Sequence, residues 1–326
     1  MTATPTLDVK SLRVEFPGRH GTVTALSDVT LSIQPGEILG VVGESGAGKS
    51  MTGLAVQGLL EPPGHVSGGE VWLDGRRIDT LSDAEMEKVR GKEIGAIFQD
   101  PLTSLNPLFS VGQQLMETIR LHLNLDRKAA RARAVDLLAE VGIPAPNERV
   151  DHYPHQFSGG MRQRVVIALA LAARPKLIIA DEPTTALDVS IQAQITALLR
   201  RLCDDHGTAT MLVTHDMGVI AETADRVAVM YAGRLVEIGP VTDVIANPQH
   251  PYTAGLMGSI PALSARVPML TQIDGSMPRL DAIPHGCAFN PRCPRVMDRC
   301  RRECPTMMPS GSGESACWLN AMETTP

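Results

Sequence analysis

The chain has 326 residues, of which 43% are hydrophobic, and a formal net charge of −6. This length suits one large domain with an appendage, and the apolar content excludes wholesale disorder. The acidic balance argues against a surface that neutralises nucleic-acid phosphates, so we expect no nucleic-acid partner.

Membrane insertion and secretion are not indicated by the sequence. No apolar run approaches the roughly 18 residues that a membrane-spanning helix needs. The first residues, MTATPTLDVK, lack the basic-then-apolar pattern of a signal peptide. We therefore expect a soluble, cytoplasmic chain that can still dock onto a membrane partner.

The N-terminal part of the sequence predicts strands. Residues 7–16 and 23–33 alternate apolar and polar side chains, whereas residues 38–43, ILGVVG, are apolar without alternation, as in a strand buried on both faces. The segment GESGAGKS follows, and a helix is predicted from Met51. This order of strand, glycine loop and helix is typical of a phosphate-binding loop.

GESGAGKS fits the pattern G-x-x-x-x-G-K-[ST]. Glycines let successive N–H groups point at one phosphate, and the helix N-terminus adds partial positive charge. We expect Lys49 to reach the β- and γ-phosphates and the Ser50 hydroxyl to coordinate Mg²⁺. An ordinary glycine-rich turn is the alternative. The expected contacts to the nucleotide are Gly43, Glu44, Ser45, Gly46, Ala47, Gly48, Lys49, Ser50 and Met51.

Further strands are predicted at residues 69–75 and 93–99. Gln99 ends the second one, where its amide can reach Mg²⁺ or water, although a glutamine at a strand end is usually only polar surface. From about residue 102 to 157 apolar residues recur at three-to-four spacing, which predicts a helical insertion.

The segment FSGGMRQR follows the insertion and predicts a second anion site. Ser158 is placed to cap a helix over residues 161–173, and Gly159 and Gly160 let a ligand approach the exposed N–H groups. Because one chain's ATP already occupies its own loop, we expect this segment to serve the ATP of a neighbouring chain. An ordinary capped core helix is the alternative.

The α/β pattern then resumes. The buried strand at residues 176–181 delivers Asp181 and Glu182 to its carboxyl end, where α/β sheets bind ligands. Asp181 suits a partner of Mg²⁺, and Glu182 suits a base for the attacking water. His215 ends another apolar strand and can hydrogen-bond a γ-phosphate. Taken alone, Asp181 and Glu182 could simply be solvated carboxylates, and His215 could simply be a packed histidine.

Five of the six cysteines crowd the C-terminal part of the chain, in the pattern C-x5-C-x6-C-x3-C-x12-C. Such a cluster favours metal binding over disulfides in a cytosolic chain. The wide spacings suit an iron–sulfur cluster better than a zinc knuckle. The close pair Cys300 and Cys304 keeps a Zn²⁺ site open, and free thiols are the third alternative. Cys203 is expected in the core.

These motifs occur together and in order with TALD at residues 185–188, and over about residues 5–250 they resemble the ATP-binding subunits of ABC transporters. The resemblance implies an α/β P-loop NTPase core, with a mostly parallel sheet, an N-terminal antiparallel β region and an inserted helical subdomain. It also implies that two subunits meet head to tail, with each ATP between the phosphate loop of one and the Ser158–Gly160 segment of the other.

The resemblance assigns roles to single residues. It implies that Phe16 stacks on adenine, although tyrosine is commoner there, and that Gln99 senses Mg²⁺ and links to the insertion. It implies that Asp181 supports Mg²⁺ and Glu182 is the general base. Asp188 is implied to communicate across the dimer, and His215 to be the switch histidine. Met161 and Phe157 depart from the commoner glutamine and leucine.

A narrower resemblance comes from DPLTSLNPLFSVGQQL, HPYTAGLMGSIP and GCAFNPRCP. These segments are similar to the dipeptide and oligopeptide import branch, and nickel and glutathione importers share much of the pattern. We expect an ATP-binding domain over 1–245, with the helical insertion at about 102–157, and a cysteine-bearing extension over 246–326. The resemblance implies a [4Fe–4S] cluster that staples this extension and leaves Cys304 out. Its ligands would be Cys287, Cys293, Cys300 and Cys317.

The predicted function is ATP hydrolysis that powers a peptide importer. The implied partners are a second, paralogous ABC ATPase subunit, two integral-membrane permease subunits and, indirectly, an extracytoplasmic peptide-binding protein. A homodimer is the alternative. The implied location is peripheral, on the cytoplasmic face of the inner membrane. The rival functions are a soluble ABC ATPase acting on ribosomes or DNA, and an iron–sulfur redox sensor with an ATPase attached.

Overall fold

The computed structural model describes residues 4–19, 21–185, 187–258 and 273–322. Ala186 of the TALD segment and residues 259–261 of HPYTAGLMGSIP lie outside the described residues. The chain divides into two compact units. The first unit comprises the described residues of 1–7, 33–38 and 80–212, and the second those of 8–32, 39–79 and 213–326.

The first unit combines part of a sheet with a group of helices. Its strands follow the order β8, β7, β6, and β6 and β7 are parallel, with Ile94 opposite Leu177 and Ile97 opposite Ala180. β7 is apolar and buried over four successive residues, as expected of a strand covered on both faces. The strands of this unit are β6 (Ile94–Ile97), β7 (Leu177–Asp181) and β8 (Ala209–Val213), the last up to Leu212.

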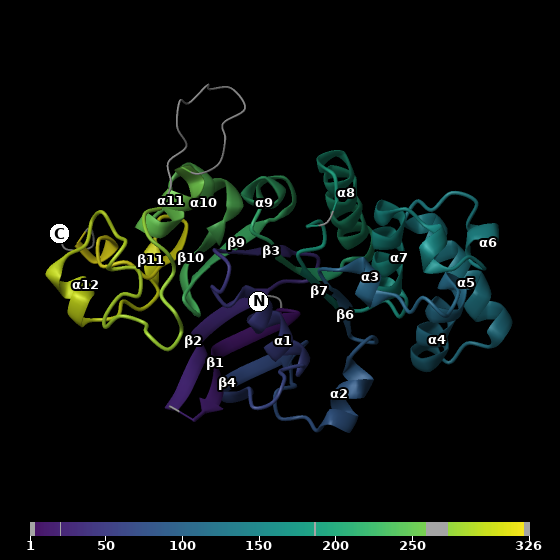
Figure 1. Ribbon diagram of the computed structural model, residues 1–326, viewed down its shortest axis with the longest axis horizontal. Coiled ribbons are helices and arrows are strands. Elements are labelled where there is room, and N and C mark those ends of the chain that lie inside the picture. The colour runs from purple at the N-terminus through teal and green to yellow at the C-terminus, as the bar shows by residue number, and fades with distance from the viewer. Residues whose placement is uncertain (1–3, 20, 186, 259–272, 323–326) are drawn as a thin grey trace. The chain divides into compact units, whose positions relative to one another are not determined.

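The segment between β6 and β7 is helical, both within the predicted insertion at about 102–157 and beyond it in α7. In Figure 1, α4, α5, α6 and α7 gather in one group, and α5 packs on α4, α6 and α7. A Cβ on Gly112 of α4 would lie 2.5 Å from the carbonyl oxygen of Val150, so glycine permits this close packing. The helices of the first unit are α2 (Asp83–Val89), α3 (Pro101–Ser104), α4 (Val111–Leu123), α5 (Arg127–Glu140), α6 (Pro146–Arg149), the 3-10 turn Pro154–Gln156, α7 (Gly159–Leu171) and α8 (Val189–His206).

The second unit contains two groups of strands. One has the order β2, β1, β4, β5, with β4 and β5 antiparallel. The other has the order β11, β12, β10, β9, β3, in which β3 and β9 are parallel and the remaining pairs antiparallel. The strands are β1 (Leu7–Gly18), β2 (Gly21–Ile33), β3 (Ile38–Val42), β4 (His65–Leu73), β5 (Arg76–Arg77), β9 (Arg226–Tyr231), β10 (Arg234–Pro240), β11 (Met308–Ser310) and β12 (Gly313–Ser315).

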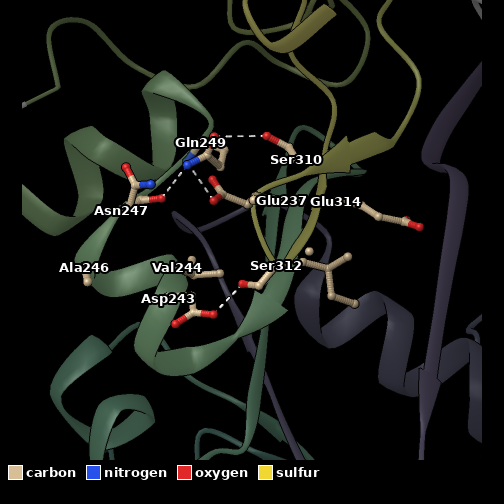
Figure 2. A pocket seen from close by; sticks show the side chains of 12 residues that line it. Glu237, Asp243, Val244, Ala246, Asn247, Gln249, Ser310, Ser312 and Glu314 are labelled. Atoms are coloured by element: carbon tan, nitrogen blue, oxygen red, sulfur yellow. Dashed lines mark hydrogen bonds between the residues drawn. The ribbon is translucent and has the colours of Figure 1, made fainter. Parts of the chain in front are cut away.

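The described part of the C-terminal extension contains a β-hairpin that joins the second group of strands. The hairpin of β11 and β12 adds to β10, with Glu237 opposite Ser315. Figure 2 shows how it is fastened: Ser312 donates a hydrogen bond to Asp243, and Ser310 donates to Gln249 at 3.0 Å, around a cavity of about 300 Å³. The helices of this unit are α1 (Lys49–Gln57), α9 (Met217–Thr223), α10 (Val241–Ala246), α11 (Pro251–Gly258), α12 (Asp298–Arg302) and the 3-10 turn Asn320–Met322.

Most predicted elements are confirmed, with shifted ends. The helix after FSGG begins at Gly159, two residues before the predicted start, because Ser158 caps it directly. It ends at Leu171, two residues before the predicted end. Cys203 is buried in α8, as expected. Within the described residues no helix is long and apolar enough to cross a membrane.

Candidate functional site

The predicted phosphate loop lies between β3 and α1 in the second unit. Its glycines at 43, 46 and 48 all have positive φ, of 150°, 81° and 105°. At Gly43 an added Cβ would lie 2.3 Å from the carbonyl oxygen of Met230, so the surrounding chain leaves no room for a side chain there. Glycines with positive φ among residues with negative φ curl a backbone so that its N–H groups face a common point.

Lys49 is held inside this loop. Its ammonium donates to the carbonyl oxygens of Gly43 and Glu44 at 2.9 and 3.1 Å, and the residue is only 6% exposed. The carbonyl of Ala47 accepts from the N–H of Gly233, which ties the loop to the turn between β9 and β10. Ser45, Gly46 and Ser50 are exposed. The loop therefore combines a fixed backbone with an accessible face.

His215 belongs to the same unit. It is exposed and lies between β8 and α9. The N–H of the preceding residue, Thr214, donates to the carbonyl of Val41 in β3 at 3.2 Å, and its hydroxyl accepts from the N–H of Asp216. The backbone on both sides of His215 is thereby fixed at the carboxyl end of β3, the strand that leads into the phosphate loop.

Phe16, the residue expected against adenine, lies near the end of β1 in the second unit and is half-buried. Its ring packs closely on Gly64, where an added Cβ would lie 2.4 Å from Cε1. The ring is therefore held by its own chain, and its adenine contact stays a prediction.

The predicted acidic residues lie in the first unit, at the end of β7. Asp181 is the last residue of the strand, and Glu182 follows in the left-handed region with φ of 47°. Such a backbone costs a non-glycine residue roughly 1–2 kcal/mol, and strain of this kind clusters at functional sites. The strand end therefore holds Glu182 in a specific, unfavourable conformation.

Gln99 and Glu182 meet in this unit, 83 positions apart in the chain. The amide Nε2 of Gln99 donates to Oε2 of Glu182 at 3.0 Å, and Thr185 Oγ1 donates to the same oxygen at 2.7 Å. The sequence predicts roles for both Gln99 and Glu182 but misses Thr185. Its position three residues after Glu182, within DEPTT, could have indicated this contact. This arrangement orients a carboxylate, as a general base requires.

The Ser158–Gly160 segment also lies in the first unit. Ser158 Oγ accepts from the N–H of Met161 at 3.4 Å, which confirms the predicted cap. Ser158 and Gly159 are exposed, and a Cβ added to Gly159 would only make ordinary contact, 3.8 Å from Leu187. Asp188 is the exposed N-cap residue of α8. The start of α7 is thus an open helix N-terminus.

The four predicted cluster cysteines line one small cavity in the second unit, whereas Cys304 is exposed and lines a different one. Burial raises the pKa of the Cys287 thiol to about 12, and burial also raises the pKa of Cys293 and Cys317. Across the described residues, however, no group of three or more His, Cys, Asp or Glu side chains is arranged to hold a metal ion. The geometry thus gives the predicted cluster no direct support, although four soft thiols around one cavity fit it chemically.

Comparisons with known proteins agree with these features. The model of the ABC transporter family matches residues 26–185, and the model of the C-terminal region of oligopeptide/dipeptide transporters matches residues 236–300. Among solved structures, the dimeric ATP-binding cassette MJ0796 bound to ADP and Pi is 30% identical, with a TM-score of 0.64 over 72% of this chain and 98% of that chain. The cbiO1 protein of Clostridium perfringens has a TM-score of 0.65 over 75% and 92%, also at 30% identity.

The fold and the site define the class: the chain belongs to the ABC transporter ATP-binding proteins, the ATPases whose hydrolysis of ATP is coupled to transport. It is 47% identical to the oligopeptide transport ATP-binding protein OppD of Haemophilus influenzae, over 97% of this chain and 98% of that protein. It is 49% identical to the dipeptide transport ATP-binding protein DppD of Bacillus subtilis, over 96% and 94%. Within the class it thus belongs to the oligopeptide/dipeptide branch.

Proposed function

We propose that this chain binds and hydrolyses ATP to power a membrane importer of dipeptides or oligopeptides. The observation that carries the proposal is Glu182, held at the end of β7 by Gln99 and Thr185, in a chain that also carries a complete phosphate loop. Relatives named for oligopeptide and dipeptide transport support the substrate class. Nickel or glutathione is the alternative cargo.

The residue roles follow the chemistry of the side chains. The loop from Gly43 to Met51 would bind the phosphates, with Lys49 against the β- and γ-phosphates and Phe16 against adenine. Ser50 would coordinate Mg²⁺, Gln99 would sense it and Asp181 would support it. The bound ion would neutralise charge on the phosphates. Glu182 would take the proton of the attacking water, and His215 would contact the γ-phosphate.

A second ATPase subunit would complete each site. The exposed N-terminus of α7 at Ser158, Gly159 and Gly160 offers N–H groups and partial positive charge to a phosphate. A relative of this fold, bound to ADP and Pi, is dimeric, which supports a sandwich of two chains. Asp188 would lie at the contact between them. We propose a paralogous partner, with a homodimer as the alternative.

Membrane permease subunits would dock on the helical insertion. Leu102, Leu108 and Phe109 of the first unit are 62%, 79% and 48% exposed, and two of them line a cavity of about 790 Å³. Apolar side chains gathered on a surface typically mark a contact with another protein. We propose that the chain lies peripherally on the cytoplasmic face of the inner membrane, within an assembly of two permeases that an extracytoplasmic peptide-binding protein serves.

We also propose a [4Fe–4S] cluster in the C-terminal extension, held by Cys287, Cys293, Cys300 and Cys317. Their shared cavity and the exclusion of Cys304 from it support this ligand set. The cluster would staple a module that is too short to build its own core. Iron with equal acid-labile sulfide in the purified protein is the expected result, whereas stoichiometric zinc would establish the alternative.

The function is tested by purifying the chain from native membranes with its subunits, alongside the Glu182→Gln variant. The amide keeps the shape of the side chain but cannot accept the proton, so we expect ATP hydrolysis to fall by about 100-fold or more while ATP binding is retained. Unchanged turnover would remove Glu182 from its role. Recovery with ribosomes or nucleic acid in place of permeases would establish the soluble alternative.

A further inference from the structure

An ion pair joins the C-terminal extension to the phosphate loop within the second unit. Arg292, which lies next to Cys293 in the sequence, donates from Nη1 to Oε2 of Glu44 at 2.7 Å and from Nη2 to Oε1 at 2.9 Å. Glu44 is the second residue of GESGAGKS. Parallel bonds of this kind give an arginine–carboxylate pair both strength and a fixed geometry.

Contacts other than the ion pair with Glu44 also hold the guanidinium of Arg292 in place. Nε donates to the carbonyl of Asp274 at 2.8 Å, and the rings of Tyr231 and Phe289 lie 5.9 Å from Cζ. The side chain is only 7% exposed. Removing one partner of such a pair is more costly than removing one partner of an exposed pair, because the other charge is left largely shielded from water and uncompensated.

Glu44 is held by its backbone as well. Its N–H donates to the phenol oxygen of Tyr252 in α11 at 2.8 Å. The Tyr252 ring is buried and packs edge-on against Tyr231 and Phe289, with centroids 4.7 and 5.4 Å away. Two parts of the extension, α11 and the cysteine-bearing segment, therefore grip one loop residue.

The gripped residue is also a contact of the loop lysine. The carbonyl of Glu44 accepts from Lys49 Nζ at 3.1 Å. Fixing Glu44 therefore fixes one of the two carbonyls that position this ammonium. Arg292 also neutralises a carboxylate that would otherwise stand next to bound phosphates and repel them.

We infer that Arg292 and Tyr252 are positioning residues that hold the phosphate loop in its binding conformation, so that the C-terminal extension sets the affinity for ATP. This inference rests on the proposed binding of ATP at the loop. Ordering the loop in advance lowers the entropy cost of binding. The extension thereby contributes to nucleotide binding without touching the nucleotide.

The test is the affinity of the full-length chain for ATP, measured by calorimetry, with KM and kcat measured on the membrane complex. We expect Arg292→Ala to weaken ATP binding and raise KM by about tenfold with kcat nearly unchanged. Tyr252→Phe keeps the ring and removes the acceptor, so we expect about a threefold effect. Arg279→Ala is the matched control, because its ion pair with Asp281 is exposed and lies in the same extension.

A double variant separates positioning from general stability. Adding Glu44→Gln to Arg292→Ala removes the uncompensated carboxylate, so we expect it to recover part of the lost ATP affinity, which loss of fold would not allow. Equal affinity for ATP in Arg292→Ala and Arg279→Ala would overturn the inference. Lys49→Ala tests the proposed function itself: if it abolishes ATP binding while Arg292→Ala has no effect, only the inference fails.

Discussion

The two glycine-bearing loops of this chain differ in what constrains them. The phosphate loop is fixed by its own unit: Gly43 has no room for a Cβ beside Met230, and Lys49 is bonded inside the loop. Ser158 and Gly159 are exposed, and Gly159 has room for a methyl group, whereas a Cβ on the following Gly160 would lie 2.8 Å from Ile191. A glycine that its own fold does not require is expected to serve a ligand or another chain. The comparison therefore separates a glycine that the fold itself requires, Gly43, from one that a ligand or another chain would require, Gly159.

The largest effect is expected from Gly43→Ala. The new methyl group would lie 2.3 Å from the Met230 carbonyl at a φ of 150°, so we expect a loss of about 3 kcal/mol in the free energy of unfolding. Gly46→Ala is the control, because φ is 81° there but space is open; it should cost only about 1 kcal/mol. Urea denaturation measures both. Equal losses would show that packing does not constrain the loop.

Gly159→Ala is expected to separate stability from activity. The methyl group meets only Leu187 at 3.8 Å, so the free energy of unfolding should change by no more than about 0.5 kcal/mol. In the assembled transporter we expect ATP hydrolysis to fall by about 100-fold, because a neighbour's phosphate could no longer approach the helix. Full activity of the assembled variant would make this segment an ordinary helix start.

The smallest effect is expected from Ser158→Ala. Loss of the cap to Met161 should lower the free energy of unfolding by about 0.5 kcal/mol, at the low end of cap substitutions, because the bond is long and exposed. Thermal denaturation measures the change. Ser158→Asp keeps an acceptor for the N–H groups and should restore stability. If ATP hydrolysis by the assembled transporter falls in Ser158→Asp although stability is restored, the added negative charge opposes the approach of phosphate.

Local patterns predict the core of the fold and the motif residues. The apolar runs in β3 (Ile38–Val42) and in the first four residues of β7 (Leu177–Asp181) predict buried strands. The phosphate loop follows the first run, and Asp181 and Glu182 follow the second. These signals are short-range: backbone pattern and chemistry lie in the same few residues. The same holds for Ser158, because the cap joins it to Met161, only three residues further along the chain.

The contacts that the sequence does not reveal are long-range. Glu44 and Arg292 are 248 positions apart, and neither periodicity nor motif spacing pairs them. The pairing of β12 with β10 is also missed, because three-residue strands rich in glycine and serine carry little β signal. The cysteines illustrate the opposite case: their grouping is visible in sequence and in space, but grouping alone does not supply metal-ligand geometry.

The pairing of β10 with β12 has a consequence for truncated forms of the chain. Unpaired strand edges present rows of N–H and C=O groups that recruit strands from other molecules. Here the backbone of Glu237 and Ile238 is covered by Ser315 and Glu314 of the chain's own hairpin. Shortening the chain ahead of β11 would uncover the edge of β10, which carries Leu235, Val236 and Ile238, and self-association through that edge would follow.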